Sequence, residues 1–253
     1  MSKFMLITKK QNVPNFTVKI DDTFLESCVS YKYLGVILDN KLNWGPHIEH
    51  IAPKIAKACG ALARLRNCTS TDVLKNVYHA LIHSYLRYGI LIWGNASQSV
   101  LSPLQILLNK AVRIMVFAPY GNTDLSPAYD YLKLLDVAKI YMLETGKFQY
   151  KFKKDLLLTV IGNYFNTSAD NVAQHNYGLR SRNNNKAPRF ISCSKIGEKC
   201  IQFKSNQIWN AMPLDIKNSE SLSIFKSAYK KFLSESDIDP NMFLNPTNLL
   251  LCS

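Results

Sequence analysis

The alternation of hydrophobic and polar positions at the start of the chain predicts β-structure. The runs Lys3–Thr8 and Phe16–Ile20 predict two strands, separated by a turn around Pro14. A third run, Tyr31–Leu38, is rich in β-branched and aromatic residues and is the strongest strand signal in the protein. The alternation then ends, so residues 1–46 are expected to form a small β unit.

From His47 onward, apolar residues recur every three or four positions, which predicts helices. The apolar stripe of the first helix is Ile48, Ile51, Ile55, Ala58, Cys59, Leu62 and Leu65. Pro53 falls in the early turns, where a proline is tolerated but can delay the start of the helix. A second helix is expected from Thr71 or Asp72, and its core stripe is Leu74, Val77, Leu81, Tyr85 and Tyr88.

A third helix is expected from Ser102, with Pro103 at its first position. Its apolar stripe is Leu107, Leu108, Ala111, Ile114 and Met115. A fourth helix is predicted over 136–152 with Val137, Ile140 and Leu143 inward, and a last amphipathic helix over 221–233. Residues 166–200 are polar and predict irregular or weakly β structure.

These elements predict a mainly α fold with a small N-terminal antiparallel β-hairpin unit, a helical bundle and an irregular basic C-terminal region. The predicted segments are a β unit (1–46), a three-helix bundle (47–118), a helical extension (119–165), a basic region (166–235) and a flexible tail (236–253). The core of the bundle is expected to contain Ile51, Ile55, Leu62, Leu81, Tyr85, Ile114 and Trp93.

Composition argues against a disordered, membrane-spanning or secreted protein. Hydrophobic residues make up 47 % of the chain, which is enough for a buried core. No apolar run reaches the roughly 20 residues of a membrane-spanning helix, and the first residues lack the apolar centre of a secretory signal. The 6 cysteines have no zinc-site spacing and are expected to be reduced thiols. We therefore expect an intracellular protein of the nucleus or cytoplasm, neither secreted nor embedded in a membrane.

The net charge of +13 is concentrated in two stretches. Residues 47–115 carry eight Lys and Arg against two acidic residues, and residues 180–204 carry seven against one. Basic side chains contact phosphates, so we predict nucleic-acid binding without sequence-specific readout. The candidate residues are Lys54, Lys57, Arg64, Lys75, Arg87, Arg180, Arg182, Lys186 and Arg189. A surface that only keeps the protein soluble is the alternative.

Two acidic or histidine pairs could indicate metal sites, but a simpler interpretation is favoured for each. Asp21-Asp22 fits a hairpin turn, because no Asp or Glu precedes it to complete a two-metal site. His79 and His83 have the spacing of a zinc pair, yet they lie in a row that begins at Lys75 and ends at Arg87. An exposed basic stripe opposite the core is the favoured interpretation of that row.

Several motifs resemble the reverse transcriptases of non-LTR retrotransposons, the jockey-like and related elements. The run Tyr31-Lys-Tyr-Leu-Gly-Val-Ile-Leu-Asp39 looks like their primer-grip hairpin. The motifs that follow in order are Leu42-Asn-Trp44, Ala80 to Gly89 with Trp93-Gly94, Gln105 to Ile114, Leu132 to Tyr141, Leu179 to Arg182, and Trp209 to Pro213. Together they cover about residues 1–235, and their order and spacing are specific.

The resemblance implies primer-grip-like contacts from Tyr31, Tyr33, Leu34 and Gly35, and a thumb over 47–118. Gly35 would let the backbone approach the primer closely. The family's catalytic aspartates lie before the point at which this chain begins. The resemblance therefore implies an inactive polymerase piece, either a remnant of a truncated element or a fragment of a longer reading frame. The expected partner is an RNA or DNA template–primer duplex. The intact family enzyme would use Mg²⁺, and we expect no catalytic residue, metal or cofactor site here.

Two other functions remain open from the sequence. A hairpin without its sheet partners would leave an exposed edge, so the chain could be a helical module that binds a separate polymerase or another protein. A peripheral membrane protein is less favoured, because the apolar face of the first helix already has a partner in the bundle. No small-molecule substrate is expected.

Overall fold

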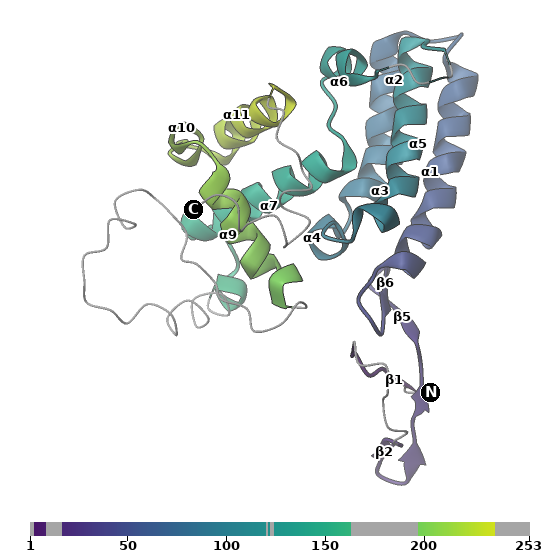
Figure 1. Ribbon diagram of the computed structural model, residues 1–253, viewed down its shortest axis with the longest axis vertical. Coiled ribbons are helices and arrows are strands. Elements are labelled where there is room, and N and C mark those ends of the chain that lie inside the picture. Colours follow the sequence, from purple (N-terminus) through teal and green to yellow (C-terminus); the bar gives the residue numbers. More distant parts are fainter. Residues whose placement is uncertain (1–2, 9–16, 120, 122–123, 163–196, 236–253) are drawn as a thin grey trace. The chain divides into compact units, whose positions relative to one another are not determined.

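The computed structural model describes residues 3–8, 17–119, 121, 124–162 and 197–235 (Figure 1). The chain forms two compact units, and each is made of two segments. Unit 1 comprises Met1–Tyr85 and Ala96–Thr123, and unit 2 comprises Leu86–Asn95 and Asp124–Ser253. The described part of the chain is mainly helical, which confirms the predicted fold class.

Unit 1 begins with short paired strands. They are β1 (Lys3–Phe4), β2 (Lys19–Ile20), β3 (Thr23–Phe24), β4 (Glu26–Ser27), β5 (Ser30–Tyr33) and β6 (Val36–Asp39). β2 pairs with β3 and β5 with β6 in antiparallel ladders, and β1 pairs with β4 in parallel. The long run predicted as one strand over Tyr31–Leu38 is two strands joined by a tight turn, because Leu34 and Gly35 both have positive φ. The predicted turn at Pro14 lies outside the described residues.

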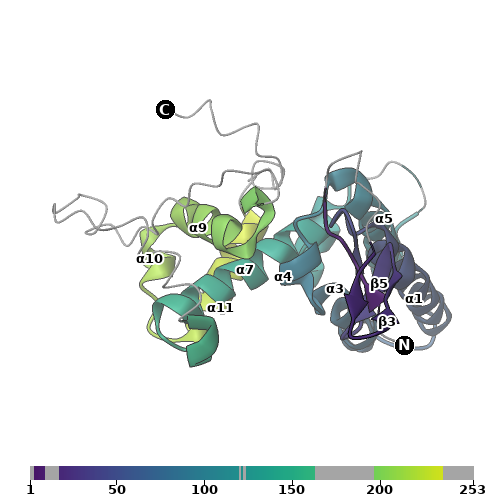
Figure 2. The same ribbon diagram turned by 90° about the horizontal axis from the view of Figure 1, so that it is seen from below.

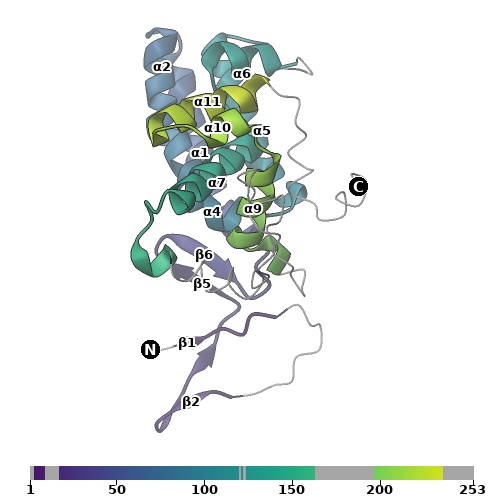
Figure 3. The same ribbon diagram turned by 90° about the vertical axis from the view of Figure 1, so that its left-hand side faces the viewer.

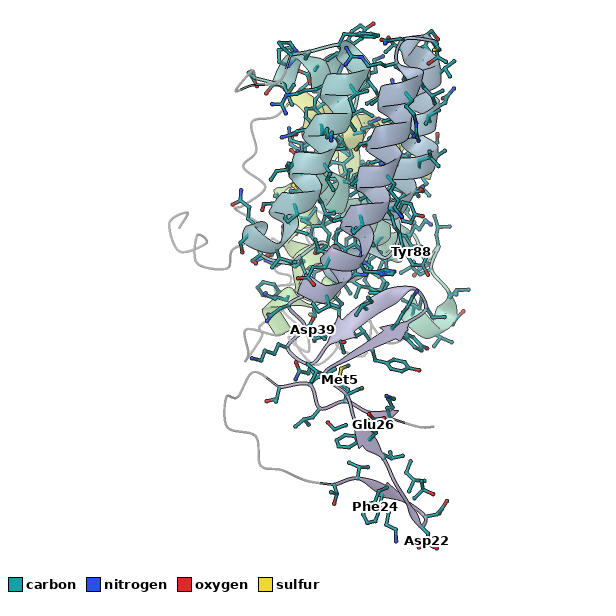
Figure 4. The ribbon with its side chains drawn as sticks, turned by 90° about the vertical axis from the view of Figure 1, so that its right-hand side faces the viewer. Met5, Asp22, Phe24, Glu26, Asp39 and Tyr88 are labelled. Atoms are coloured by element: carbon teal, nitrogen blue, oxygen red, sulfur yellow. The ribbon has the colours of Figure 1, made fainter. Side chains whose placement is uncertain are left out.

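Asp21 and Asp22 form the turn between β2 and β3, as the hairpin interpretation predicts. Asp21 has a φ of 51°, a left-handed conformation that Asp tolerates better than most residues. The Asp22 carboxylate lies 3.0 Å from the Lys19 ammonium across the turn. Figure 4 places Asp22 and Phe24 at this hairpin. The acidic pair therefore shapes a turn.

Three helical stretches follow in unit 1. They are α1 (Gly45–Leu65), then α2 (Thr71–Tyr78) with the π-helical turn η1 (His79–His83) and the start of α3 (Ser84–Arg87), and finally α5 (Gln98–Val116). The hairpin β5–β6 contacts the N-terminal end of α1 (Figure 3). Pro53 does not delay α1, which begins before His47. Pro103 lies inside α5 rather than at its start, because a proline in the second turn removes only one hydrogen bond of the helix.

The buried stripe of the second stretch differs from the predicted one. Leu81 and Tyr85 are 42 % and 38 % exposed, whereas Tyr78 and Ile82 are fully buried. The buried positions Leu74, Tyr78, Ile82 and Leu86 are four residues apart, and the π-helical turn keeps this spacing because it holds more residues per turn than an α-helix. Tyr88, the last residue of the predicted stripe, is exposed as well.

Helix α5 is a core helix of unit 1. Its length and hydropathy alone would allow it to cross a membrane. In the structure it packs along α1, and its apolar stripe is buried there. The buried residues are Leu101, Leu104, Leu108, Ala111, Val112, Ile114 and Met115. Four residues of the predicted stripe, Leu108, Ala111, Ile114 and Met115, are among them.

Unit 2 is built around helix α7. Its described elements are α4 (Ile90–Trp93), α6 (Ser126–Leu132), α7 (Val137–Lys153), the 3₁₀ turn η3 (Gly197–Lys199), α9 (Ile201–Ala211), α10 (Leu214–Lys217) and α11 (Leu222–Glu235). Helices α9 and α11 both pack on α7 (Figure 2). The predictions over 136–152 and 221–233 correspond to α7 and α11. Helices α4, α6, α9 and α10 were not predicted, and the predicted tail lies outside the described residues.

Two close approaches hold unit 2 together. The rings of Tyr150 and Phe225 lie 4.5 Å apart between α7 and α11, and the Tyr150 hydroxyl donates to the carbonyl of Ser219 at 2.8 Å. Gly146 faces the ring of Tyr229, and a Cβ at that position would lie 2.5 Å from it. Glycine at 146 therefore sets the distance at which the two helices pack.

Candidate nucleic-acid interface

The tip of the β5–β6 hairpin presents aromatic side chains and backbone to solvent. Tyr33 pairs with Val36 on either side of a two-residue turn, in which Leu34 and Gly35 have φ of 46° and 82°. Positive φ at both positions is the signature of a type I′ turn. Tyr31 and Tyr33 are two residues apart, so they share one face of the strand, and they are 51 % and 61 % exposed. All four primer-grip-like residues are thus exposed together.

Asp39 fixes the joint between the hairpin and α1. Its carboxylate accepts the backbone N–H groups of Lys41, Asn43 and Trp44, at 3.3, 3.0 and 2.8 Å. Trp44 precedes the helix with a φ of 69° and is buried. These three hydrogen bonds occupy the carboxylate, so Asp39 has a structural role at the end of the primer-grip-like run Tyr31–Asp39.

His47 attaches the hairpin to the first turn of α1. The N–H of Ile37 donates to His47 Nδ1 at 3.3 Å, and the imidazole is almost wholly buried. Burial, with smaller contributions from the nearby charges of His50 and Lys54, lowers the pKa of His47 to about 4. The ring is therefore neutral at pH 7, which leaves Nδ1 able to accept the hydrogen bond.

His50, Lys54 and Tyr85 form a small cationic and aromatic cluster beside the hairpin. The Lys54 ammonium lies 3.0 Å from His50 Nε2 and 5.6 Å from the centre of the Tyr85 ring. Desolvation lowers the pKa of His50, and the charges of Lys54 and Lys32 lower it further. Lys32 belongs to β5, so the hairpin, α1 and α3 all contribute to this cluster.

The cluster continues into a basic face on α1. With about 100° of rotation per residue, Lys54, Lys57 and Arg64 fall within an arc of roughly 80° on the helix. The buried stripe, which includes Ile51 and Leu62, lies on another side of the same helix. None of the three cations forms an ion pair with a carboxylate among the described residues. The face is therefore available to a polyanion.

Comparison with known proteins finds similar sequences. The chain is 32 % identical over 106 residues to the probable RNA-directed DNA polymerase from transposon BS of Drosophila melanogaster. It is also 32 % identical over 107 residues to the RNA-directed DNA polymerase from mobile element jockey of that species, and 28 % identical over 118 residues to that of transposon X-element. The chain is related to the reverse transcriptases of jockey-like elements. The predicted resemblance is confirmed.

The match to these reverse transcriptases is partial on both sides. It covers 41 % of this chain and 12 % of the BS and jockey proteins. The chain therefore spans about an eighth of the length of these relatives. No protein-family model matches the chain. No solved structure matches it either.

Two further predicted residues, Lys75 and Arg87, belong to elements other than α1. Lys75 is half-buried on α2. Arg87 lies in unit 2, where its Nε atom is 2.9 Å from Glu144 Oε1. The cations of the second basic stretch, Arg180, Arg182, Lys186 and Arg189, lie outside the described residues. Their role stays a prediction from the sequence.

The structure also adds residues to the interface that the sequence analysis missed. Lys32 was treated only as part of a strand, and Tyr85 was assigned to the core. His50 was not among the predicted residues, and the described residues contain no group of three or more His, Cys, Asp and Glu that could hold a metal ion. The helical period could have identified His50, which shares the arc of Lys54 and Lys57.

Proposed function

We propose that unit 1 binds the backbone of a template–primer duplex, as the thumb and primer grip of a reverse transcriptase would. The observation that carries the proposal is the alignment of the half-buried Lys54 and the exposed Lys57 and Arg64 on one face of α1, beside a hairpin that exposes Tyr31 and Tyr33. The relation to RNA-directed DNA polymerases supports it.

The chemistry of this surface favours contacts with phosphate rather than with base edges. Lysine and arginine side chains on a helix can follow a phosphate backbone, and such contacts release counterions and weaken as salt increases. The exposed hairpin tip adds two phenol rings and a glycine at which a strand can approach the main chain closely. The proposed activity is therefore binding that does not depend on sequence.

The proposal is limited to binding. A two-metal polymerase site needs clustered carboxylates. Among the described residues no such cluster exists, and the most buried carboxylate, Asp39, is used by three backbone N–H groups. We propose no catalytic residue among the described residues, and the activity proposed here is binding alone.

Binding to an RNA–DNA template–primer duplex, measured by fluorescence anisotropy over a range of salt concentrations, tests the proposal. The variant is Lys54→Gln, Lys57→Gln and Arg64→Gln combined. Each lost phosphate contact reduces the slope of log K against log salt by about 0.7–0.9, so the triple variant should lose about 2 units of slope. Duplexes of unrelated sequence should bind equally well.

The matched control removes the same charge elsewhere. Lys133, Lys154 and Lys231 are exposed lysines of unit 2, and replacing all three by Gln lowers the net charge equally. This control should keep the wild-type slope. If both triple variants lose the same slope, overall charge rather than the α1 face drives binding, and the proposal fails.

A second candidate function is association with a separate polymerase chain or another protein. The observation that favours it is the exposure of large apolar side chains on the N-terminal strands and their connections: Leu6, Ile7, Ile20, Phe24 and Val29. Exposed apolar side chains beside short unpaired strand edges mark interaction surfaces. Sedimentation that shows only monomer, with or without an active reverse transcriptase, would exclude this function.

A further inference from the structure

Two cations of unit 2, Arg87 and Lys147, contact one carboxylate, and a third cation, Lys226, is close enough to Lys147 to act on it electrostatically. Glu144 and Lys147 come from α7, Arg87 from α3 and Lys226 from α11. The Lys147 ammonium lies 2.9 and 2.8 Å from the two oxygens of Glu144, and Arg87 Nε lies 2.9 Å from the first of them. All four residues of this cluster belong to unit 2, whereas the basic face of α1 belongs to unit 1.

The charges of the cluster do not cancel. Glu144 offers one negative charge against the three positive charges of Arg87, Lys147 and Lys226. The side chain of Lys147 is only 9 % exposed. Its burial is the main cause that lowers its pKa, Glu144 opposes the shift, and the like charges of Arg87 and Lys226 lower the pKa further. The cluster therefore carries more positive than negative charge around the nearly buried ammonium of Lys147.

Some hydrogen-bond donors of the cluster have no acceptor among the described residues. Glu144 engages only the Nε atom of Arg87, and the described residues supply no hydrogen bond to its two terminal amino groups. Lys226 is exposed and forms no ion pair with a described carboxylate. Both side chains reach solvent, since Lys226 is exposed and the side chain of Arg87 is 53 % exposed. A ligand in solvent can therefore reach these donors.

We propose that this cluster binds a phosphate group. Arg87 would donate its terminal N–H groups to two phosphate oxygens, and Lys226 would contact a third from α11. A guanidinium matches phosphate geometry with two parallel hydrogen bonds. The excess positive charge of the cluster attracts an anion, and phosphate oxygens can accept hydrogen bonds from both the guanidinium of Arg87 and the ammonium of Lys226. The nearly buried Lys147 adds positive charge and holds Glu144 in place through their ion pair.

The same chemistry is offered by two sources, a free phosphate or pyrophosphate and the backbone of a nucleic acid. The variant that separates them is Lys226→Gln, which removes an exposed side chain and leaves the buried pair of Glu144 and Lys147 intact. The control is Lys231→Gln, an equal charge change on the same helix. The probes are inorganic phosphate, pyrophosphate and the RNA–DNA duplex, all at constant ionic strength.

Isothermal titration calorimetry of the full chain measures the effect. Loss of one charge-assisted contact should raise the Kd for the phosphate-bearing ligand about ten-fold in Lys226→Gln and leave it unchanged in Lys231→Gln. If pyrophosphate or phosphate binding weakens and duplex binding does not, the site takes a free phosphate. If duplex binding weakens as well and pyrophosphate competes with it, the site takes the backbone.

The proposal is overturned if neither phosphate, pyrophosphate nor duplex binding depends on Lys226, or if the two lysine variants have equal effects. Either result would leave the cluster a structural ion-pair network. The outcome is independent of the α1 face, because the variant at Lys54, Lys57 and Arg64 leaves this cluster unaltered. Failure of one proposal can thus be distinguished from failure of the other.

Discussion

His47 makes the stability of unit 1 depend on pH. In the unfolded chain a histidine takes up its proton near pH 6.5, whereas folded His47 does so only near pH 4. Between these values the unfolded state binds more protons, so the folded state is fully stable above pH 6.5 and loses stability as the pH falls toward 4.

We expect unit 1 to lose about 2 kcal/mol of unfolding free energy between pH 7.5 and pH 5 through this residue alone. In His47→Asn the side-chain oxygen can still accept the N–H of Ile37 but does not titrate, so this variant should lack that loss. Urea unfolding of the two proteins across this pH range is the measurement. Equal pH dependence in both would show that His47 is not the titrating group.

Two glycines should respond to alanine with opposite signs. At Gly146 an added Cβ would lie 2.5 Å from the Tyr229 ring, so Gly146→Ala should destabilise unit 2 by about 1–3 kcal/mol. At Gly60, inside α1, an added Cβ meets nothing within 4 Å, so Gly60→Ala should stabilise unit 1 by about 0.5–1 kcal/mol. Denaturant midpoints check both, and a neutral Gly146→Ala would contradict the close packing of α7 and α11.

At the scale of elements, the π-helical turn η1 decides which side chains are buried. Leu81→Ala should change the unfolding free energy by less than about 1 kcal/mol, because Leu81 is exposed. Ile82→Ala should cost about 2–5 kcal/mol, because Ile82 is fully buried. Thermal or urea unfolding of the two variants tests the register. If Leu81→Ala cost more than Ile82→Ala, the inward positions would be those of the regular α-helical stripe that the sequence predicts.

The elements that could be predicted from the sequence are those set by local patterns. Helix α7 was predicted closely, because its apolar period is regular and Asp136 caps it by accepting the N–H of Lys139 at 2.6 Å. The stripe after His79 could not be predicted, because a π-turn leaves no mark in a count based on 3.6 residues per turn. The alternation over Tyr31–Leu38 predicts one strand, since Leu34 is not a residue that signals a positive φ, and only the family resemblance predicts the hairpin there.

The candidate interface was predicted in part for the same reason. Lys54, Lys57 and Arg64 belong to one helix, so their common face follows from spacing alone. Lys32 and Tyr85 join them only through tertiary packing of the hairpin and of α3 beside α1. A sequence without an alignment contains no signal for contacts between such distant segments.

At the scale of the whole molecule, the two compact units should respond separately to local damage. Gly146→Ala loosens α7 against α11, so amide hydrogen exchange should become faster in α7, α9 and α11. Exchange in α1, α2 and α5 should stay within about two-fold of the wild type, since local opening is confined to cooperative units. Mass spectrometry of peptide fragments reports both groups of helices. Equal acceleration in both would show that the chain unfolds as one cooperative body.

The way the chain is divided between the units also limits how it can be dissected. The chain leaves unit 1 after Tyr85, contributes Leu86–Asn95 to unit 2, and returns at Ala96. A single cut after Thr123 would leave these ten residues, including the buried Trp93, on the wrong fragment. Neither half produced by one protease cleavage or one stop codon would hold a complete unit, so each would expose apolar surface that the intact chain covers. A separable minimal binding domain must therefore be made by excising the connecting segment, and simple truncation will not yield one.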